Sequence, residues 1–390
     1  MRGHRLARTL GRDPHETFRG ASPLELLFDL TFVIAFGVAG NELAHFLADE
    51  HFGAGVGGFL LAVFAISWAW INFSWFASAY DTDDWIFRLL TMTQMVGVLI
   101  LALGLPDMFD SFEHGAHIDI SVMVLGYIVM RVPMVFQWAR AARQDPAHRG
   151  ACEAYIVTIL VAQAGWVALL FAPTPLGLTL VFVVVLVLIE LAGPVIAETR
   201  RGGTPWHAHH IAERYGLVII IALGEGLIGT MASLSALVGP EGPGWSVDVA
   251  VVGLAGTALT FGMWWIYFII PAGEVLHARR ERSFGWGYGH IPMFGAVVAV
   301  GAGLHVAAYF IDGESQLGTL GTIVAVAIPT AIFVVGVYWI YSALTRSRDP
   351  FHLALLVGSF AVLAAAVALA ATGGTMAWCL LVLALAPWVT

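Results

Sequence analysis

The chain has 390 residues, of which 59% are hydrophobic and 12% are charged, and its formal net charge is −9. Soluble globular domains carry about 25% charged residues. This composition and a mean hydropathy of +0.83 therefore exclude a water-soluble globule and predict an all-α, polytopic transmembrane helix bundle whose partner is the lipid bilayer. The acidic balance argues against nucleic acid as a partner, because nucleic acid requires a basic face.

The absence of lysine narrows the function further, since all 18 basic residues are arginine. A P-loop requires a lysine beside the phosphates, and pyridoxal phosphate or retinal requires a lysine amine for its Schiff base. An ATP-driven pump and a retinal photoreceptor are therefore excluded, and no cofactor is predicted. Cys152 and Cys379 lie far apart without C-x-x-C spacing, which predicts reduced, structural thiols.

The first 20 residues contain five arginines and form the predicted cytoplasmic N-terminal segment, residues 1–20. The apolar segment from Leu24 to Leu47 is too long for a signal peptide and contains Glu25 and Asp29, so we interpret it as a retained first helix. Further apolar segments follow at about 55–78, 86–105, 119–139, 152–172, 176–196, 211–237, 247–270, 287–310, 320–343, 352–371 and 375–389. The sequence thus predicts about twelve membrane helices, the last of them short.

The arginines of the connectors alternate with these segments. They follow the fourth, sixth, eighth and tenth helices, at Arg140, Arg143, Arg149, Arg200, Arg201, Arg279, Arg280, Arg282, Arg346 and Arg348. Because cytoplasmic loops collect arginine, both termini are predicted to be cytoplasmic.

The two predicted halves of six helices each, residues 21–200 and 201–390, show a faint sequence similarity to each other. Glu25 begins a helix that contains Ala35-Phe36-Gly37, and Glu213 begins one that contains Ala222-Leu223-Gly224. Six is an even number, so a second copy would enter the membrane in the same direction, as in a parallel repeat. Apolar segments resemble each other even without common descent. A duplicated bundle and a bundle that did not arise by duplication are therefore both left open.

Charged groups within the apolar segments are costly, from about 2.5 to more than 10 kcal/mol at the bilayer centre, and are therefore functional candidates. The predicted residues for binding or coupling a solute or ion are Glu25, Asp29, Arg131, Glu190, Glu213, Arg214, Glu225 and His290. Arg131 is the expected counter-charge of Asp29 or Glu225, since a desolvated guanidinium needs a carboxylate. For Glu25, Glu213 and Arg214, which lie near the interface, a structural role is the alternative.

His207, His210 and Glu213 have the spacing of weak candidate metal ligands, and Glu42-x-x-His45 is a second such pattern. Both lie at predicted interfaces, where polar side chains simply reach water, and no metal is predicted. His290 and Pro292 suggest a polar break in their helix; a hydrogen-bonded buried histidine beside an ordinary proline is the alternative.

Three blocks, ELLFDLTFV at 25–33, HIAERYGLVIIIALGE at 210–225 and HIPMFG at 290–295, resemble signatures of the bacterial low-temperature-requirement A (LtrA) family. Leu27 and Thr31 depart from the family's more usual Phe and Val. The resemblance spans nearly the whole chain and implies a multi-pass protein of the bacterial inner membrane linked to growth in the cold. It implies no substrate and no catalytic residue.

The leading hypothesis is a secondary transporter or channel for a small solute or ion that uses the intramembrane carboxylates. A membrane sensor or scaffold with a structural charge network is the alternative, and self-association into a homo-oligomer is compatible with either. A metal-dependent membrane enzyme is a third class and would have to use the cluster at 207–213. No G-x-S-x-G or H-E-x-x-H signature occurs, so an enzyme is the less favoured class.

Overall fold

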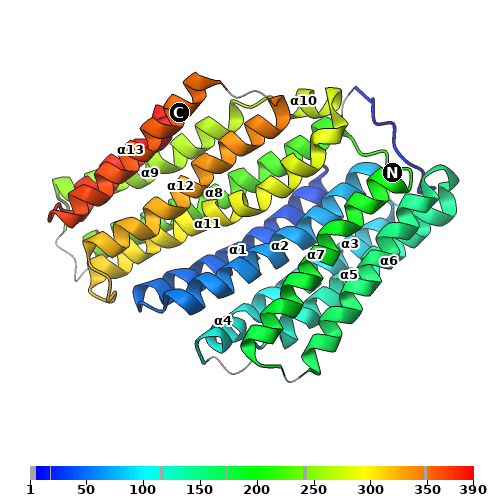
Figure 1. The fold of residues 1–390 in the computed structure, drawn as a ribbon, viewed down its shortest axis with the longest axis horizontal. Coiled ribbons are helices and arrows are strands. Elements are labelled where there is room, and N and C mark those ends of the chain that lie inside the picture. Colours follow the sequence, from blue (N-terminus) through cyan, green and yellow to red (C-terminus); the bar gives the residue numbers. More distant parts are fainter. Residues whose placement is uncertain (1–5, 18, 115–117, 173, 240–243, 347–348) are drawn as a thin grey trace. The chain divides into compact units, whose positions relative to one another are not determined.

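The computed structural model describes all residues except 1–5, 18, 115–117, 173, 240–243 and 347–348. Arg2, Arg5 and Arg348, which belong to the predicted cytoplasmic arginines, lie outside the described residues. In the part that is described, eleven helices are long and apolar enough to cross a membrane, and a twelfth apolar helical stretch, Met376–Val389, is shorter (Figure 1). The predicted polytopic bundle of about twelve helices, the last of them short, is confirmed.

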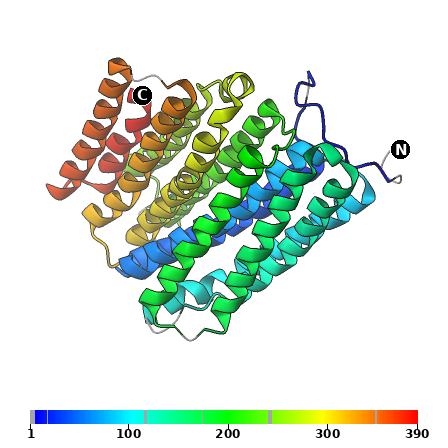
Figure 2. The same ribbon diagram turned by 45° about the vertical axis from the view of Figure 1, so that its right-hand side comes forward.

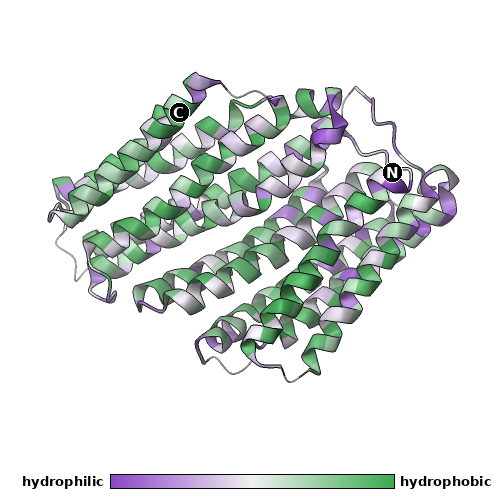
Figure 3. Cartoon of the chain, in the orientation of Figure 1, coloured by the Kyte–Doolittle hydropathy of each residue, from purple (hydrophilic) through white to green (hydrophobic). Residues whose placement is uncertain are grey.

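The elements follow in chain order as α1 (Pro23–Ala48), α2 (Phe52–Tyr80), α3 (Trp85–Leu103), α4 (Leu105–His114), α5 (Ser121–Gln144), η1 (Pro146–His148), α6 (Arg149–Leu170), α7 (Leu176–Arg200), α8 (Ala208–Val238), α9 (Val247–Phe268), α10 (Ala272–Ala278), η2 (Arg280–Arg282), α11 (Ser283–Asp312), α12 (Thr319–Thr345), α13 (Pro350–Ala371), α14 (Met376–Ala384) and η3 (Ala386–Val389). In hydrocarbon a helix satisfies its own backbone hydrogen bonds, which explains why the apolar segments are helical throughout. Figure 3 shows the apolar residues along the helices, with hydrophilic residues concentrated near their ends.

The chain forms two compact units. The first unit comprises Met1–Ala35 and Ala65–Arg214, and the second comprises Phe36–Phe64 and Tyr215–Thr390. Helices α1, α2 and α8 therefore contribute residues to both units. The division of the sequence into halves at residue 200, and their origin by duplication, stay predictions.

In the first unit, α3 packs against α5, and α5, α6 and α7 follow one another side by side (Figure 2). Gly97 and Gly126 allow α3 and α5 to approach closely, because a Cβ on Gly126 would lie 2.6 Å from the carbonyl oxygen of Gly97. The N-terminal segment crosses the end of this unit. Its backbone donates from Thr9 to Gln144 Oε1 at 2.7 Å and from Gly11 to Asp145 Oδ2 at 3.1 Å.

In the second unit, α11 packs along α12, and α14 packs against α9 and α13. Gly303 of α11 faces the backbone of Ala325 of α12, and Gly262 of α9 faces Pro387 and Trp388. The small residues of these helices are thus packing contacts, as glycines in membrane helices commonly are. The sequence suggested a polar break or a kink at His290 and Pro292; helix α11 continues through Pro292, which rules out a break, and a kink stays a prediction.

Candidate functional site

Glu25 lies in the first turn of α1 and helps to cap the N-terminus of this helix. Its backbone N–H donates to Ser22 Oγ at 3.3 Å, and the backbone N–H of Ser22 donates to Glu25 Oε2 at 2.8 Å. This reciprocal pair is a capping box, in which two backbone N–H groups without helical partners are satisfied together. The box fixes the Glu25 carboxylate and leaves Oε1 directed away from the cap.

Arg214 of α8 binds both acids of α1. Its Nε donates to Asp29 Oδ2 at 3.1 Å and its Nη2 to Asp29 Oδ1 at 2.5 Å, while its Nη1 donates to Glu25 Oε1 at 2.8 Å. Trp70 of α2 adds a hydrogen bond to Asp29 Oδ1 at 2.6 Å, and its ring lies beneath the guanidinium. The side chains of Glu25, Asp29 and Arg214 are all 0% exposed. A buried ion pair is tolerated when the planar guanidinium donates several hydrogen bonds to the carboxylate oxygens, as Arg214 does here.

Three further groups complete what we call the acid cluster, namely Arg19, Asp81 and His210. Arg19 Nη2 lies 3.7 Å from Glu25 Oε1 and 3.4 Å from Asp81 Oδ2. His210 Nε2 lies 3.1 Å from Glu25 Oε1, which is an ion-pair distance. Within the described residues both ring nitrogens of this fully buried histidine are without a hydrogen bond.

The charges of the acid cluster do not balance. It holds three carboxylates, Glu25, Asp29 and Asp81, against the two guanidiniums of Arg19 and Arg214. One proton, on the imidazole of His210 or on a carboxylate, makes the cluster neutral.

Asp81 lies just beyond α2, and burial, together with the nearby Glu25 carboxylate, raises the pKa of Asp81 to about 6. His207 precedes α8, where its Nδ1 accepts from the backbone N–H of His210 at 3.2 Å and its Nε2 lies 3.0 Å from the carbonyl oxygen of Glu16. A carbonyl only accepts, so Nε2 carries the proton. Burial lowers the pKa of His207, consistent with a neutral ring. The nearby Glu16 is paired with Arg12 at 2.8 Å.

A second buried charge pair lies in the same unit. Arg131 of α5 donates from Nη2 to both oxygens of Glu190 of α7, at 2.9 and 3.0 Å, and Trp68 donates to Glu190 Oε2 at 2.7 Å. Arg131 also lies over the ring of Tyr127. One guanidinium and one carboxylate balance each other, in contrast to the acid cluster.

The expectation that Arg131 is the counter-charge of Asp29 or Glu225 is wrong, since its partner is Glu190 and the partner of Asp29 is Arg214. The members of each pair lie at similar depths along their helices. Asp29 and Arg214 each lie six residues inside the start of their helices, about 9 Å at 1.5 Å per residue. Arg131 and Glu190 lie 13 and 10 residues before the ends of theirs, about 20 and 15 Å.

In the second unit, His290 is fully buried in α11. Its Nδ1 lies 2.7 Å from the carbonyl oxygen of Trp286, so it donates there, and its Nε2 accepts from the hydroxyl of Tyr267 at 2.9 Å. The rings of Tyr215 and Trp286 flank it. Both ring nitrogens are satisfied by a neutral imidazole, which is the structural alternative considered for this residue.

Glu225, also in the second unit, lies midway along α8. Glycines make room for it, since a Cβ on Gly37 would lie 2.8 Å from Glu225 Oε1 and one on Gly301 would lie 2.8 Å from Glu225 Cβ. The side chain is half-buried, and among the described residues it has no cationic or hydrogen-bonding partner.

The weak metal candidates are not assembled into a site. His207 uses both ring nitrogens on backbone groups, and Glu213 points outward and is exposed, although it neighbours Arg214. The part of the chain that the structure describes contains no group of three or more His, Cys, Asp or Glu placed to hold a metal ion.

Sequence reasoning named Glu25, Asp29 and Arg214 as coupling candidates and His210 only as a weak metal candidate. It missed Arg19 and Asp81, whose role depends on loops meeting a helix end. A signal for Glu25 was present in Ser22-Pro23-Leu24-Glu25, because S-x-x-E before an apolar run is a capping box.

These features define a polytopic helical membrane protein with buried, hydrogen-bonded charge clusters inside its spans. The chain belongs to the bacterial low temperature requirement A (LtrA) family, whose model matches residues 20–387. It is similar to an uncharacterized protein of Rhizobium meliloti (strain 1021), with 27% identity over 361 residues that cover 87% of this chain and 82% of that protein. No solved structure matches the chain.

Proposed function

We propose that this LtrA-family protein is a secondary transporter for a small solute or ion, coupled to protons through the acid cluster. The observation that carries the proposal is the charge imbalance of that cluster, three carboxylates against two guanidiniums. An unbalanced charge in a low-dielectric interior is costly, so the cluster favours binding one proton. Reversible protonation of buried acids is how many membrane carriers use a proton gradient.

The groups of the cluster that can exchange a proton are Asp81, Glu25 and His210, and Arg19 remains a guanidinium that holds Asp81 and Glu25 near each other. Asp81 lies at the helix end, Arg19 bridges it to Glu25, and Glu25 faces His210 across 3.1 Å. Because the pKa of Asp81 is raised to about 6, this acid exchanges its proton near neutral pH. His210, whose Nε2 lies 3.1 Å from Glu25 Oε1, is the proposed second group that takes up the proton.

Glu225 is the proposed second site for a proton or cation. A carboxylate in the middle of a span, without a counter-charge among the described residues, needs an external partner of positive charge. Gly37 and Gly301 lie directly against Glu225, so a side chain at either position would displace this carboxylate.

We further propose that the chain lies in the bacterial inner membrane with both termini in the cytoplasm. Its support is the arginine bias of the connectors. In the first unit, the N-terminal segment contacts the arginine-bearing α5–α6 connector and also contacts Pro205, just beyond Arg200 and Arg201. Reporter fusions at each terminus test this orientation.

The proposed activity is tested by flux in proteoliposomes that contain a pH-sensitive dye and are exposed to gradients of a panel of ions and small solutes. We expect at least one solute gradient to move protons, and Asp81→Asn to abolish that proton movement while the protein stays folded. Glu213→Gln removes an exposed acid from the same region and should behave as the wild type. No flux with any member of the panel would overturn the proposal.

A structural scaffold is the second candidate, and the complete burial of Glu25, Asp29, His210 and Arg214 favours it. A fully buried network of ion pairs can hold helices together without exchanging ions or protons with water. On this alternative, neutralising a cluster acid would lower the unfolding free energy, and the wild type would transport nothing.

A further inference from the structure

A groove opens on the first unit at the end where the N-terminal segment crosses α3 and α5. It has a volume of about 1050 Å³. Its lining divides into a basic part, Arg8, Arg140 and Arg143, and an apolar part that includes Ile86, Val132 and Phe136.

The N-terminal segment forms one wall and is held there by hydrogen bonds. The backbone N–H of Ala7 donates to Asp84 Oδ2 at 3.2 Å, and Arg140 Nη2 donates to the carbonyl oxygen of Ala7 at 2.7 Å. Arg140 also binds Asp84, the N-cap of α3. This arginine therefore fixes the wall, and its charge is compensated.

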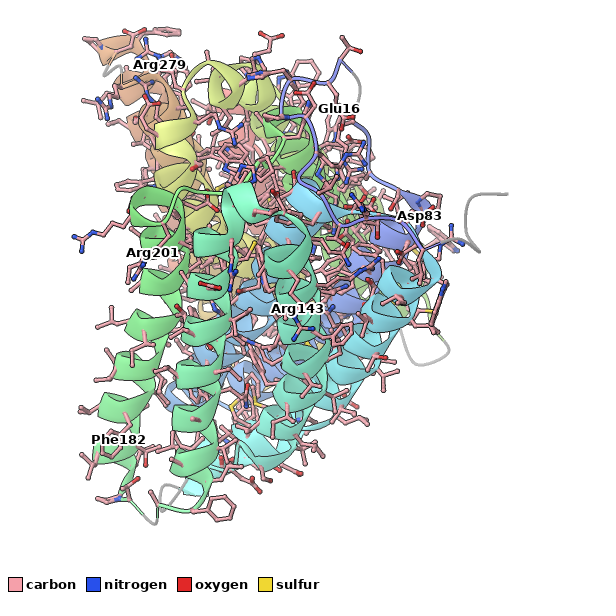
Figure 4. The ribbon with its side chains drawn as sticks, turned by 90° about the vertical axis from the view of Figure 1, so that its right-hand side faces the viewer. Glu16, Asp83, Arg143, Phe182, Arg201 and Arg279 are labelled. Atoms are coloured by element: carbon pink, nitrogen blue, oxygen red, sulfur yellow. The ribbon has the colours of Figure 1, made fainter. Side chains whose placement is uncertain are left out.

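Arg8 and Arg143 differ from Arg140. Both are exposed, and neither has a carboxylate partner among the residues that the structure describes. Arg201, which is labelled with Arg143 in Figure 4, belongs to the same unit but follows α7 and does not line the groove. Two guanidiniums without counter-ions at one mouth favour an anion with several acceptor oxygens.

The apolar part extends from this mouth along α5. Eleven residues separate Arg143 from Val132, about 16 Å of helix at 1.5 Å per residue. Val132 is 66% exposed and Phe136 is 52% exposed, so these side chains face hydrocarbon or a bound apolar group. A free inorganic anion would use the basic mouth alone and leave this part of the groove unused.

We propose that the groove binds an anionic phospholipid, with its phosphate between Arg8 and Arg143 and an acyl chain along Ile86, Val132 and Phe136. The arginine-rich end of a membrane protein meets the headgroup region, and basic pockets beside membrane helices are suited to anionic headgroups. The volume is of the size that holds a drug-sized ligand, which matches a headgroup and the upper part of a chain. This inference does not depend on transport activity.

The test measures lipid retained by the purified full-length protein in native mass spectrometry. Phosphatidylglycerol and phosphatidylcholine with identical acyl chains are compared, and inorganic phosphate is offered as a competitor. We expect preferential retention of phosphatidylglycerol, and little displacement by phosphate because it lacks the acyl chain.

The variant Arg8→Gln with Arg143→Gln should weaken phosphatidylglycerol binding by about fivefold per arginine, or about 25-fold in total. The control is Arg200→Gln with Arg201→Gln, which removes two exposed arginines outside the groove and should change nothing. Phe136→Ala should weaken both lipids without altering the preference between them. Circular dichroism confirms that each variant is folded.

Equal retention of the two lipids would overturn the proposal, as would equal losses in the groove variant and in the control. Full displacement by inorganic phosphate would show that the mouth binds a simple anion and would overturn the lipid assignment. If Arg8 and Arg143 together prevented folding, Arg143→Gln alone, at an exposed helix end, would give the same comparison with about a fivefold effect.

Discussion

Arg214 holds Asp29 with two nitrogens, Nε on one carboxylate oxygen and Nη2 on the other, and both side chains are fully buried. This fork leaves Nη1 for Glu25, so one guanidinium serves two carboxylates. The arrangement fixes the first two turns of α1 and α8 against each other inside the first unit. It also leaves the acid cluster one positive charge short.

Removal of Arg214 should be severely destabilising. Arg214→Gln leaves two buried carboxylates without their main partner, and removing one member of a buried ion pair costs about 3–5 kcal/mol. Chemical unfolding in detergent measures the loss. The neighbouring substitution Glu213→Gln, at an exposed site, is the matched control and should change the unfolding free energy by less than about 0.5 kcal/mol. Equal stability of the two variants would contradict the buried network.

The pair of Arg131 and Glu190 should show strong energetic coupling. We expect Arg131→Gln and Glu190→Gln each to destabilise by several kcal/mol, about 3–5 in comparable buried pairs, and the double variant to cost much less than their sum. The same cycle on Arg149 and Glu153, an exposed pair at 2.6 Å, should give less than about 1 kcal/mol. Additive losses at Arg131 and Glu190 would disprove the pairing.

Asp81 should make stability depend on pH in a defined direction. Its pKa in the folded protein, about 6, is above the ordinary 3.8, so the folded state holds the proton more tightly than the unfolded state. The contribution of the protonated Asp81 side chain to the free energy of unfolding is therefore complete below about pH 4, and it is lost as the pH rises through about 6. The change corresponds to about 3 kcal/mol at most. The free energy of unfolding, measured across this pH range, should fall with rising pH in the wild type and should lose this dependence in Asp81→Asn. An unchanged pH dependence in the variant would refute the assignment.

His290 should matter for stability and not for proton coupling. Tyr267→Phe removes one hydrogen bond to a buried nitrogen and should cost about 1–3 kcal/mol, because His290 Nε2 is left unsatisfied. Thermal unfolding measures this loss. A change in the pH dependence of activity at unchanged stability would instead place His290 in the functional site.

The number, order and approximate ends of the spans were predictable from the sequence, because hydrocarbon thickness and backbone hydrogen bonding leave little freedom. The cost of burying charge also identified Asp29, Arg131, Glu190 and Arg214 as residues that need partners.

The cost of burying a charge did not predict which residue pairs with which. Arg131 was assigned to Asp29 or Glu225, because residue counting gives depth along a helix but not the identity of the neighbouring helix. Arg19 and Asp81 join the acid cluster through loops, which carry no periodic signal. Their role follows only from the three-dimensional contacts between a helix end and two connectors.

The central claim, that the acid cluster holds an exchangeable proton, is tested most directly by proton titration of the purified protein in lipid nanodiscs. Between about pH 5 and about pH 8 the wild type should take up one proton more than Asp81→Asn, in which two carboxylates face two guanidiniums. Glu213→Gln should titrate like the wild type in this range. Identical titration of the wild type and Asp81→Asn would contradict the account.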